Sequence, residues 1–233
     1  KSDYTIGSFS HFENKINISF VNKIEIGGRF ELIIYYHGNP STSGFGSFEF
    51  GSHGNNIPAI WSLSEPFGAP DWWPCKDDLS DKVDSSDVWI ICPNDLIAAS
   101  NGLLQLVEEN DENSKIYHWK NRYSIAHYLI SIAVSDYQLF EEKWKYEGYD
   151  SMPIMNFIYP ENFTELNKNR LSKVKDMLTI FSDYFGVYPF VNEKYGHAQF
   201  GWGGGMEHQT CSSMGGFGES LIAHELMHQW FGD

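Results

Sequence analysis

The sequence predicts a mixed fold, in which an all-β N-terminal domain of the sandwich or saddle type is followed by an α/β region. Short segments rich in Ile, Val, Tyr and Phe recur through the first ~140 residues, as expected for strands. Turn residues such as Gly, Asn and Pro separate these segments, and no helical period lies between them. Apolar residues recur at three- and four-residue spacing only later in the chain, which indicates that helices enter there.

The first part is expected to contain a series of short strands and one long loop. The predicted strands are Lys15–Val21, Arg29–Tyr36, Val88–Cys92, Ile116–Trp119 and Tyr128–Val134. The loop is Ser64–Ser80, which contains two Trp and three Pro. Loops of this length in a compact domain are usually functional or disordered. This loop is too aromatic for a disordered segment, so a functional role is the better prediction.

The second part alternates strands and helices. Strands are predicted at Met152–Tyr159 and Lys194–Phe200, and an amphipathic helix passes through Leu171–Phe185. Thr164 is a suitable N-cap for that helix, and Gly186 a suitable residue just beyond its end. The chain closes on a predicted helix over Glu219–Phe231. We therefore expect a domain boundary near residue 141, with a β-rich domain over 1–141 and an α/β domain over 142–233.

Composition excludes some classes of partner. The chain has 16 Lys and Arg against 31 Asp and Glu, a formal net charge of −15. Because nucleic acids and anionic membranes need positive charge on a protein, neither is an expected partner. No stretch reaches the ~18 apolar residues of a membrane-spanning helix. The three cysteines are far apart and form no metal-binding pair. The oligomeric state is left open.

The predicted last helix carries a pattern typical of a metal site. It reads His224-Glu225-Leu226-Met227-His228. Residues four apart share one helical face, so the two imidazoles converge on one point. Two neutral imidazoles suit zinc, and Glu225 can take a proton from a water at the metal. The sequence therefore predicts a zinc centre with His224 and His228 as ligands and Glu225 as the general base.

A glycine cluster with an acidic residue precedes this helix. It reads Gly203-Gly204-Gly205-Met206-Glu207-His208 and begins 21 residues before His224 (224 − 203). Glycines after a strand allow another extended chain to approach the backbone closely, as a peptide substrate would. Glu207 in such a place could hold a cation. Glycines alone would more often mark a turn or bulge, and the nearby zinc motif favours the functional interpretation.

Several segments together resemble the zinc aminopeptidases related to aminopeptidase N. That family carries G-[AG]-M-E-N followed by H-E-x-x-H with an aromatic-rich tail, and this chain has G-G-M-E-H and then H-E-L-M-H-Q-W-F-G-D. Ser64–Ala69, Trp73–Asp78 and Ala98–Gly102 also resemble segments of the family's β domain. The resemblance runs from about residue 60 to the end of the chain, in the family's order. It implies a thermolysin-like catalytic domain after the β domain.

The resemblance implies a role for each site residue. His224 and His228 would bind one zinc ion, and Glu225 would activate water. Glu207 would bind the free α-amine of a peptide, and Glu65 would share that task and shape the first specificity pocket. The implied substrate-binding set is Glu207, Glu65, Gly204, Gly205, Met206 and His208. An anchored ammonium group leaves only the first amide bond over the metal, so the expected partners are peptides with a free N-terminus.

This chain departs from the family's pattern at several points. The third zinc ligand, a Glu about 19 positions after the second His, would fall near position 247, beyond the 233 residues of this chain. We therefore expect an N-terminal fragment of a longer protein, with weak zinc binding and little activity by itself. His208 stands where the family usually has Asn, and Pro70 stands where many relatives have Arg. Glu207 and His224 are separated by 17 positions (224 − 207), which looks short.

The function expected of the parent protein is hydrolysis of the first peptide bond of peptides. One alternative is a different hydrolase on the same scaffold, such as the epoxide-opening chemistry of leukotriene hydrolase. Another is a non-catalytic peptide-binding protein, which loss of Glu225 or of a His ligand would mark. Localisation is left open between a secreted or periplasmic protein and a cytoplasmic one. The N-terminal residue preference of the enzyme is also left open.

Overall fold

The computed structural model describes residues 6–41 and 46–232, which divide into two compact units, 1–38 and 39–233. The first unit contains an antiparallel hairpin of β1 (Ile6–Phe12) and β2 (Lys15–Phe20). Its two turn residues, Glu13 and Asn14, both have positive φ, the geometry that matches the twist of a two-residue hairpin. The strand expected at Lys15–Val21 is thus confirmed apart from its last residue.

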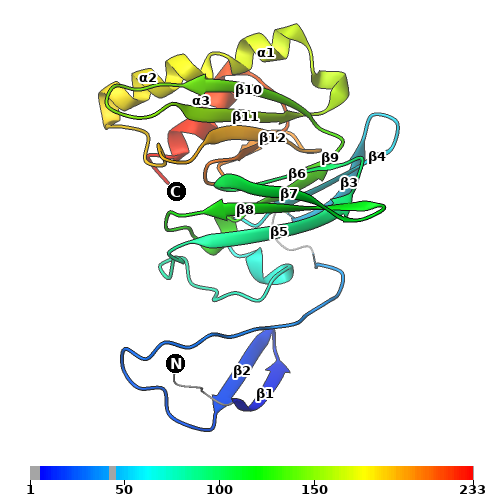
Figure 1. Ribbon diagram of the computed structural model, residues 1–233, viewed down its shortest axis with the longest axis vertical. Helices are drawn as coiled ribbons and strands as arrows, with labels where there is room; N and C mark the ends of the chain where they lie inside the picture. The colour runs from blue at the N-terminus through cyan, green and yellow to red at the C-terminus, as the bar shows by residue number, and fades with distance from the viewer. Residues whose placement is uncertain (1–5, 42–45, 233) are drawn as a thin grey trace. The chain divides into compact units, whose positions relative to one another are not determined.

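The prediction of a strand at Arg29–Tyr36 was wrong, because these residues lie in no strand of the described structure (Figure 1). The richness of this segment in Ile, Tyr and Phe suits a strand. A strand forms, however, only where a neighbouring strand pairs with its backbone N–H and C=O groups. None of the described sheets includes residues 29–36.

The second unit begins with two antiparallel sheets, which form the expected β-rich part (Figure 1). The first sheet has the order β3-β4-β9-β6 and the second β5-β8-β7. Their strands are β3 (Ser47–His53), β4 (Ile57–Leu63), β5 (Ser86–Pro93), β6 (Ile97–Ser100), β7 (Leu103–Asp111), β8 (Ser114–Asn121) and β9 (Ile132–Ser135). The predicted loop after β4 contains one short 3-10 turn, η1 (Ala69–Asp71), and a second turn, η2 (His127–Leu129), precedes β9.

A five-stranded mixed sheet follows, in the order β10-β11-β12-β14-β13. Its strands are β10 (Gln138–Trp144), β11 (Met152–Ile158), β12 (Tyr195–Gln199), β13 (Gly205–Met206) and β14 (Ser212–Met214). β11, β12 and β14 are parallel, whereas β10 and β13 are antiparallel to their neighbours. The connection from β11 to β12 carries η3 (Pro160–Asn162), α1 (Glu165–Leu171) and α2 (Val174–Phe185). This is the predicted change from an all-β to an α/β pattern.

The single helix expected through Leu171–Phe185 is two helices with a break between them. Thr164 caps α1 as predicted, because its Oγ1 accepts the N–H of Asn167 at 3.3 Å. Gly186 ends α2 with a φ of +95°, a conformation that glycine adopts without strain. The apolar periodicity continues across the break, since Leu171, Val174 and Leu178 are all fully buried.

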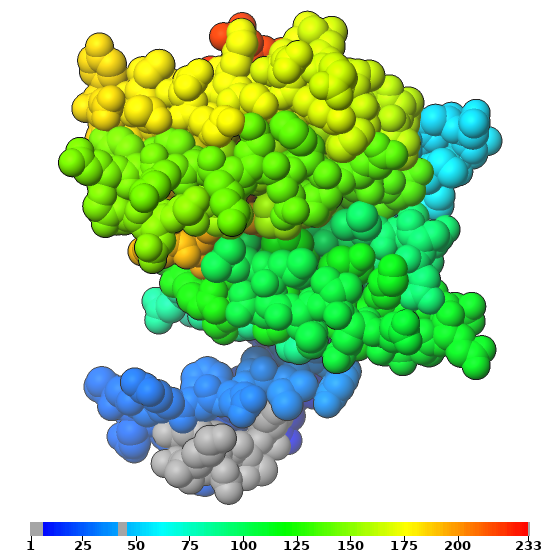
Figure 2. Space-filling view, turned by 45° about the horizontal axis from the view of Figure 1, so that its top comes forward, coloured from blue at the N-terminus to red at the C-terminus, as the bar shows by residue number. Residues whose placement is uncertain are grey.

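Polar contacts attach α2 to the outer strand of the mixed sheet. Trp144 on β10 donates its indole N–H to Thr179 Oγ1 at 2.9 Å. Lys175 pairs with Glu142 of the same strand at 2.6 Å. Figure 2 shows the surface of this layer, in which the yellow helical residues lie directly on the light-green strand residues. The helical layer thereby holds the sheet that carries the glycine cluster.

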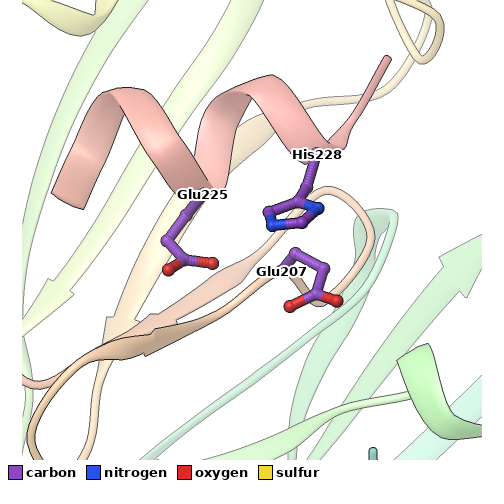
Figure 3. Close-up of side chains that lie close together, drawn as sticks. All are labelled: Glu207, Glu225 and His228. Atoms are coloured by element: carbon purple, nitrogen blue, oxygen red, sulfur yellow. The ribbon is translucent and has the colours of Figure 1, made fainter. Parts of the chain in front are cut away.

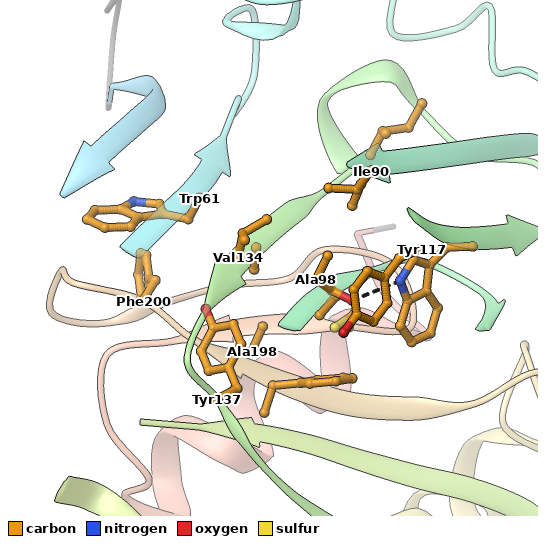
Figure 4. Packing of buried hydrophobic residues seen from close by; sticks show 14 of the residues in the cluster. Trp61, Ile90, Ala98, Tyr117, Val134, Tyr137, Ala198 and Phe200 are labelled. Atoms are coloured by element: carbon orange, nitrogen blue, oxygen red, sulfur yellow. Dashed lines mark hydrogen bonds between the residues drawn. The ribbon is translucent and has the colours of Figure 1, made fainter. Parts of the chain in front are cut away.

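The β-rich part and the mixed sheet share one hydrophobic core. Ala198 on β12 and Phe200 just after it pack in the same cluster as Trp61 of β4 and Val134 of β9 (Figure 4). Tyr137 also belongs to this cluster and donates its hydroxyl to Gln199 O at 2.7 Å. A second cluster lies between the mixed sheet and the helices, and it includes Leu178 and Leu226. Together the two clusters hold the 39–233 unit in one piece.

The expected boundary near residue 141 falls inside β10, the first strand of the mixed sheet, and both sides of it belong to the 39–233 unit. The division into domains at 1–141 and 142–233 therefore stays a prediction. None of the helices in the described residues combines the length and the apolar character needed to cross a membrane.

The buried His197 on β12 should make stability depend on pH. Burial lowers its pKa from 6.5 to about 3, and its Nδ1–H donates to Asn156 Oδ1 at 2.7 Å. Between pH 6.5 and 3 the unfolded chain binds a proton there and the folded chain does not, so acidification lowers the free energy of unfolding. The His197→Gln protein lacks this titrating group. Its free energy of unfolding should therefore fall less steeply on acidification, by up to about 1.4 kcal/mol per pH unit. Urea titrations at pH 7, 5.5 and 4 would measure the free energy of unfolding of both proteins. The same dependence on pH in both proteins would contradict this prediction.

Candidate active site

The predicted last helix forms as α3 (Glu219–His228), three residues shorter than expected. Ile222 and Leu226, four residues apart, are fully buried and attach one face of the helix to the second core cluster. The helix ends because the N–H groups of Gln229 and Trp230 bond to carbonyls three residues back rather than four. Gly232 then turns the chain with a φ of +106°.

The two histidines of α3 lie side by side near its C-terminus. Their Nε2 atoms are 3.3 Å apart, and the two rings are inclined at 85°. Two nitrogens that each lie 2.0–2.1 Å from a tetrahedral zinc would be about 3.4 Å apart. His224 is exposed and His228 half-buried. The pair therefore fits a zinc ion held at the mouth of the site.

Glu225 lies between the two histidines in sequence but is buried, with 3% of its surface exposed. Burial raises its pKa to about 7, and the nearby carboxylates of Glu207 and Glu65 act in the same direction. A carboxylate with a pKa near neutrality can both accept and release a proton at physiological pH. This environment suits the general-base role expected from the sequence.

Gly205 on β13 packs directly against the Glu225 carboxylate. A Cβ at position 205 would lie 2.5 Å from Glu225 Oε1, closer than real Cβ contacts allow. The absence of a side chain at this position thus makes room for the proposed base. This reason for a glycine was missed by sequence reasoning, which considered only the approach of a substrate.

Gly205→Ala should therefore impair activity more than folding. The added methyl group would displace the Glu225 carboxylate, and a displacement of about 1 Å can lower turnover by about 10²-fold. Gly216→Ala is the matched control, since nothing lies within 4 Å of a Cβ there. Steady-state rates and thermal midpoints of both variants would test this. If the two variants were equally active, the steric argument would fail.

Glu207 brings a second carboxylate to the end of α3. Oxygen atoms of Glu207 and Glu225 and a ring nitrogen of His228 all lie within 4.8 Å of one another. Figure 3 shows Glu225 and His228 extending from α3 toward Glu207, which lies on the loop after β13. Only 9% of Glu207 is exposed. Residues 207 and 225, which the sequence assigned to two motifs, are therefore neighbours in space.

Glu65, from the long loop after β4, adds a third carboxylate. Burial and the charge of Glu207 raise its pKa, and the His228 imidazole acts in the opposite direction. Three carboxylates beside two imidazoles create a strongly negative site. Such a site favours cations, whether a metal ion or an ammonium group.

A pocket of about 250 Å³ opens beside these carboxylates. It is lined by Leu63, Glu65, Trp202, Gly203, Gly205 and Met206. Trp202 and Leu63 were not predicted as site residues. The adjacency of Trp202 to the glycine cluster was the available signal for it, and Leu63 likewise lies only two residues before Glu65. The apolar lining and the single acid suit a small ligand with one positive group.

The remaining predicted residues lie around this pocket in different ways. Gly204 has a φ of +79°, and its carbonyl accepts the N–H of Gly215 at 2.8 Å. His208 is fully buried, and its Nδ1 bonds with Ser213 Oγ at 2.9 Å. Its side chain thus contacts β14, so the substrate-binding role expected for His208 stays a prediction.

Known proteins resemble this chain in sequence and in fold. Residues 4–129, more than half of the chain, match the family model of the peptidase M1 N-terminal domain. Glutamyl aminopeptidase of Mus musculus is 27% identical over 186 residues, covering 72% of this chain and 19% of the mouse protein. The chain therefore spans about a fifth of the length of that relative.

Two solved structures illustrate the likeness in fold. A two-domain M1 zinc metallopeptidase bound to L-tryptophan superposes with a TM-score of 0.69 at 24% identity. The M1 zinc metallopeptidase from Deinococcus radiodurans, bound to a Tyr-Ser-Ala substrate, gives 0.67 at 26% identity. Each match covers 84% of this chain and 45% of the solved chain. The expected fold, a β-rich part followed by an α/β part, is confirmed by this likeness.

The family match over residues 4–129 and these likenesses agree with the residues gathered at the end of α3. The chain belongs to the M1 peptidase family, whose aminopeptidase N-like members it resembles.

Proposed function

We propose that the protein is a zinc aminopeptidase that hydrolyses the first peptide bond of peptides with a free N-terminus. The observation that carries this proposal is the cluster at the end of α3, where a paired set of imidazoles adjoins a buried base and two further carboxylates. Zinc binding and the activation of water do not by themselves require Glu207 and Glu65. The additional acids, Glu207 and Glu65, favour a substrate that carries a positive charge.

His224 and His228 are the residues that would hold zinc. Their Nε2 separation of 3.3 Å supports this assignment. The third protein ligand would be a glutamate outside the 233 residues of this chain, so we propose that residues 1–233 alone bind zinc weakly and have little activity. When bound, zinc supplies a Lewis acid that polarises the carbonyl of the scissile bond.

Glu225 would move the protons of the reaction. Its buried carboxylate would take a proton from the attacking water and deliver it to the nitrogen of the leaving amine. The C–N bond breaks as the new C–O bond forms, so the products are an amino acid and a peptide shortened by one residue. The pKa near 7 supports both halves of this proton transfer.

Glu207 and Glu65 would bind the α-ammonium group of the substrate. The Glu207 carboxylate lies within 4.8 Å of that of Glu225, and the charge of Glu65 is near enough to raise the pKa of Glu225. An ammonium group held there leaves room for one residue before the metal, so only the first peptide bond reaches it. The pocket of about 250 Å³ beside Glu65 and Met206 would receive the side chain of that residue.

Gly204 and Gly205 would pair with the main chain of the peptide. β13, which contains Gly205, is the end strand of the mixed sheet in the described residues. The outer edge of an end strand can accept an extended peptide through backbone hydrogen bonds. The glycine residues would let the peptide approach without steric conflict.

The proposal is tested by comparing an aminoacyl fluorogenic amide with the same amide after N-acetylation. The zinc-loaded full-length protein that contains this chain should cleave the free-amine substrate at least ~10²-fold faster, because acetylation removes the charge that the acids bind. Equal cleavage of both would leave a zinc hydrolase without an amine anchor. Cleavage of neither, across a panel of side chains, would favour the epoxide-hydrolase or peptide-binding alternatives.

A further inference from the structure

The loop that carries Glu207 has an irregular backbone. Residues 207–211 connect β13 to β14, and Thr210 adopts a positive φ of +63°, which is rare for a residue with a branched side chain. The loop is nevertheless buried throughout. Buried backbone groups outside a helix or sheet need partners from elsewhere, so the side chains that bond to this loop determine where it lies.

Gln229 provides such partners from the end of α3. Its Oε1 accepts the N–H of Thr210 at 2.8 Å, and its Nε2 donates to the carbonyl of Glu207 at 3.1 Å. The side chain is buried, with 2% exposed. One planar carboxamide therefore bonds to the start and the far side of the loop at once. Gln229 follows His228 directly in sequence. Its hydrogen bonds therefore connect the loop to the helix that carries the two histidines.

Two other buried side chains bond to the same loop from other parts of the fold. Lys194 donates from Nζ to Thr210 O at 3.1 Å and to Ser100 O at 3.0 Å. Asn101 donates to Gln209 O at 2.6 Å. These bonds attach the loop to the residue just before β12 and to the turn after β6. They do not reach α3, so they cannot by themselves set the distance between Glu207 and the histidines.

We propose that Gln229 is a positioning residue that holds Glu207 at the correct distance from His228 and so sets which peptide bond of a substrate is cleaved. The inference rests on the proposed function, because it assumes that Glu207 binds the substrate amine. Without the Gln229 bonds the loop keeps its attachment to Lys194 and Asn101 but loses its hydrogen bonds to the end of α3. The ammonium site and the metal site then no longer keep a fixed separation.

The test uses two hydroxamates that differ only in an α-amine. Both bind zinc through the hydroxamate, and only one offers an ammonium group to Glu207. Calorimetry on the zinc-loaded full-length protein should show that the amine-bearing compound binds at least ~30-fold more tightly. In Gln229→Leu this preference should fall by about 10-fold or more, while the affinity for the compound without the amine and the zinc content stay unchanged. KM for the aminoacyl amide should rise more than kcat falls.

Asn156→Leu is the matched control for general destabilisation. Asn156 is also a buried carboxamide with two hydrogen bonds, to Phe140 O and to the ring of His197, and neither bond reaches residues 207–211. The Asn156→Leu variant should lower the thermal midpoint as Gln229→Leu does, but it should keep the preference for the hydroxamate that carries the amine. Should Gln229→Leu fail to fold, Gln229→Met replaces it, since methionine keeps a similar side-chain length, adds no charge and removes the hydrogen bonds to both Thr210 N–H and Glu207 O.

The outcomes separate this inference from the function on which it rests. If the unaltered protein binds both hydroxamates equally, the amine anchor itself is wrong. If the unaltered protein prefers the amine and the Gln229 variants keep that preference in full, the positioning role alone is wrong. A loss of preference that Asn156→Leu reproduces would likewise overturn the positioning role.

Discussion

Replacing Glu225 by glutamine is expected to lower kcat of the proposed full-length zinc aminopeptidase by about 10²–10⁴-fold, the usual contribution of a general base. Glutamine has nearly the same shape, and it should keep the packing against Gly205. It cannot accept a proton, however, so the attacking water stays unactivated. Steady-state rates on a free-amine substrate, together with zinc analysis, would measure the effect.

Zinc should remain bound in this variant, because the two histidines do not depend on Glu225 for their geometry. Glu219→Gln is the control on the same helix. Glu219 is exposed at the start of α3 and pairs with Lys173 at 2.5 Å, so its loss should leave turnover unchanged. Turnover within about 3-fold of the unaltered protein in Glu225→Gln would refute the base assignment.

Replacing Glu207 by glutamine is expected to lower kcat/KM for free-amine substrates by about 10²-fold. Removing one partner of a buried charge pair typically costs 2–5 kcal/mol, and about 2.7 kcal/mol corresponds to that factor. Most of the loss should appear in KM, because the ammonium group loses its anchor before the reaction begins. Glu193→Gln provides a control at another buried glutamate, which accepts the backbone N–H of Arg122 at 2.6 Å.

Zinc content distinguishes two roles for Glu207. Its carboxylate lies close enough to His228 to share a metal ion with it. The resemblance to the aminopeptidases instead implies that Glu207 is the amine anchor. If Glu207→Gln lost zinc, Glu207 would be a ligand in this protein and the amine-anchor argument would fail. If zinc stayed and the preference for free amines disappeared, the anchor would be supported.

Local patterns allowed much of the fold to be predicted. The capping of α1 by Thr164, the end of α2 at Gly186 and the strands around Ile116–Trp119 and Met152–Tyr159 all form as expected. These features depend on residues close together in the sequence. The strand prediction at Arg29–Tyr36 was wrong because strand formation depends on a partner strand elsewhere in the chain, which no local pattern specifies.

For the candidate site, the sequence by itself determined that the side chains of His224 and His228 are neighbours, with Glu225 in the same turn. Residues four apart in a helix lie on the same face, whatever the rest of the fold. The sequence also identified Glu207 and Glu65 through resemblance. It could not reveal that burial and these two carboxylates raise the pKa of Glu225 to about 7, or that Glu65 lines one pocket with Trp202.

Only the tertiary structure decided those relations, because they arise from segments far apart in the chain. The core shared between two kinds of sheet brings the long loop after β4 to the end strand β13, and the second cluster attaches the helix α3 to the same mixed sheet. The hydrogen bonds of Gln229 with Glu207 and Thr210 are likewise set by the tertiary structure. A hydrogen bond across 19 or more residues is fixed by packing, and no spacing rule in the sequence encodes it.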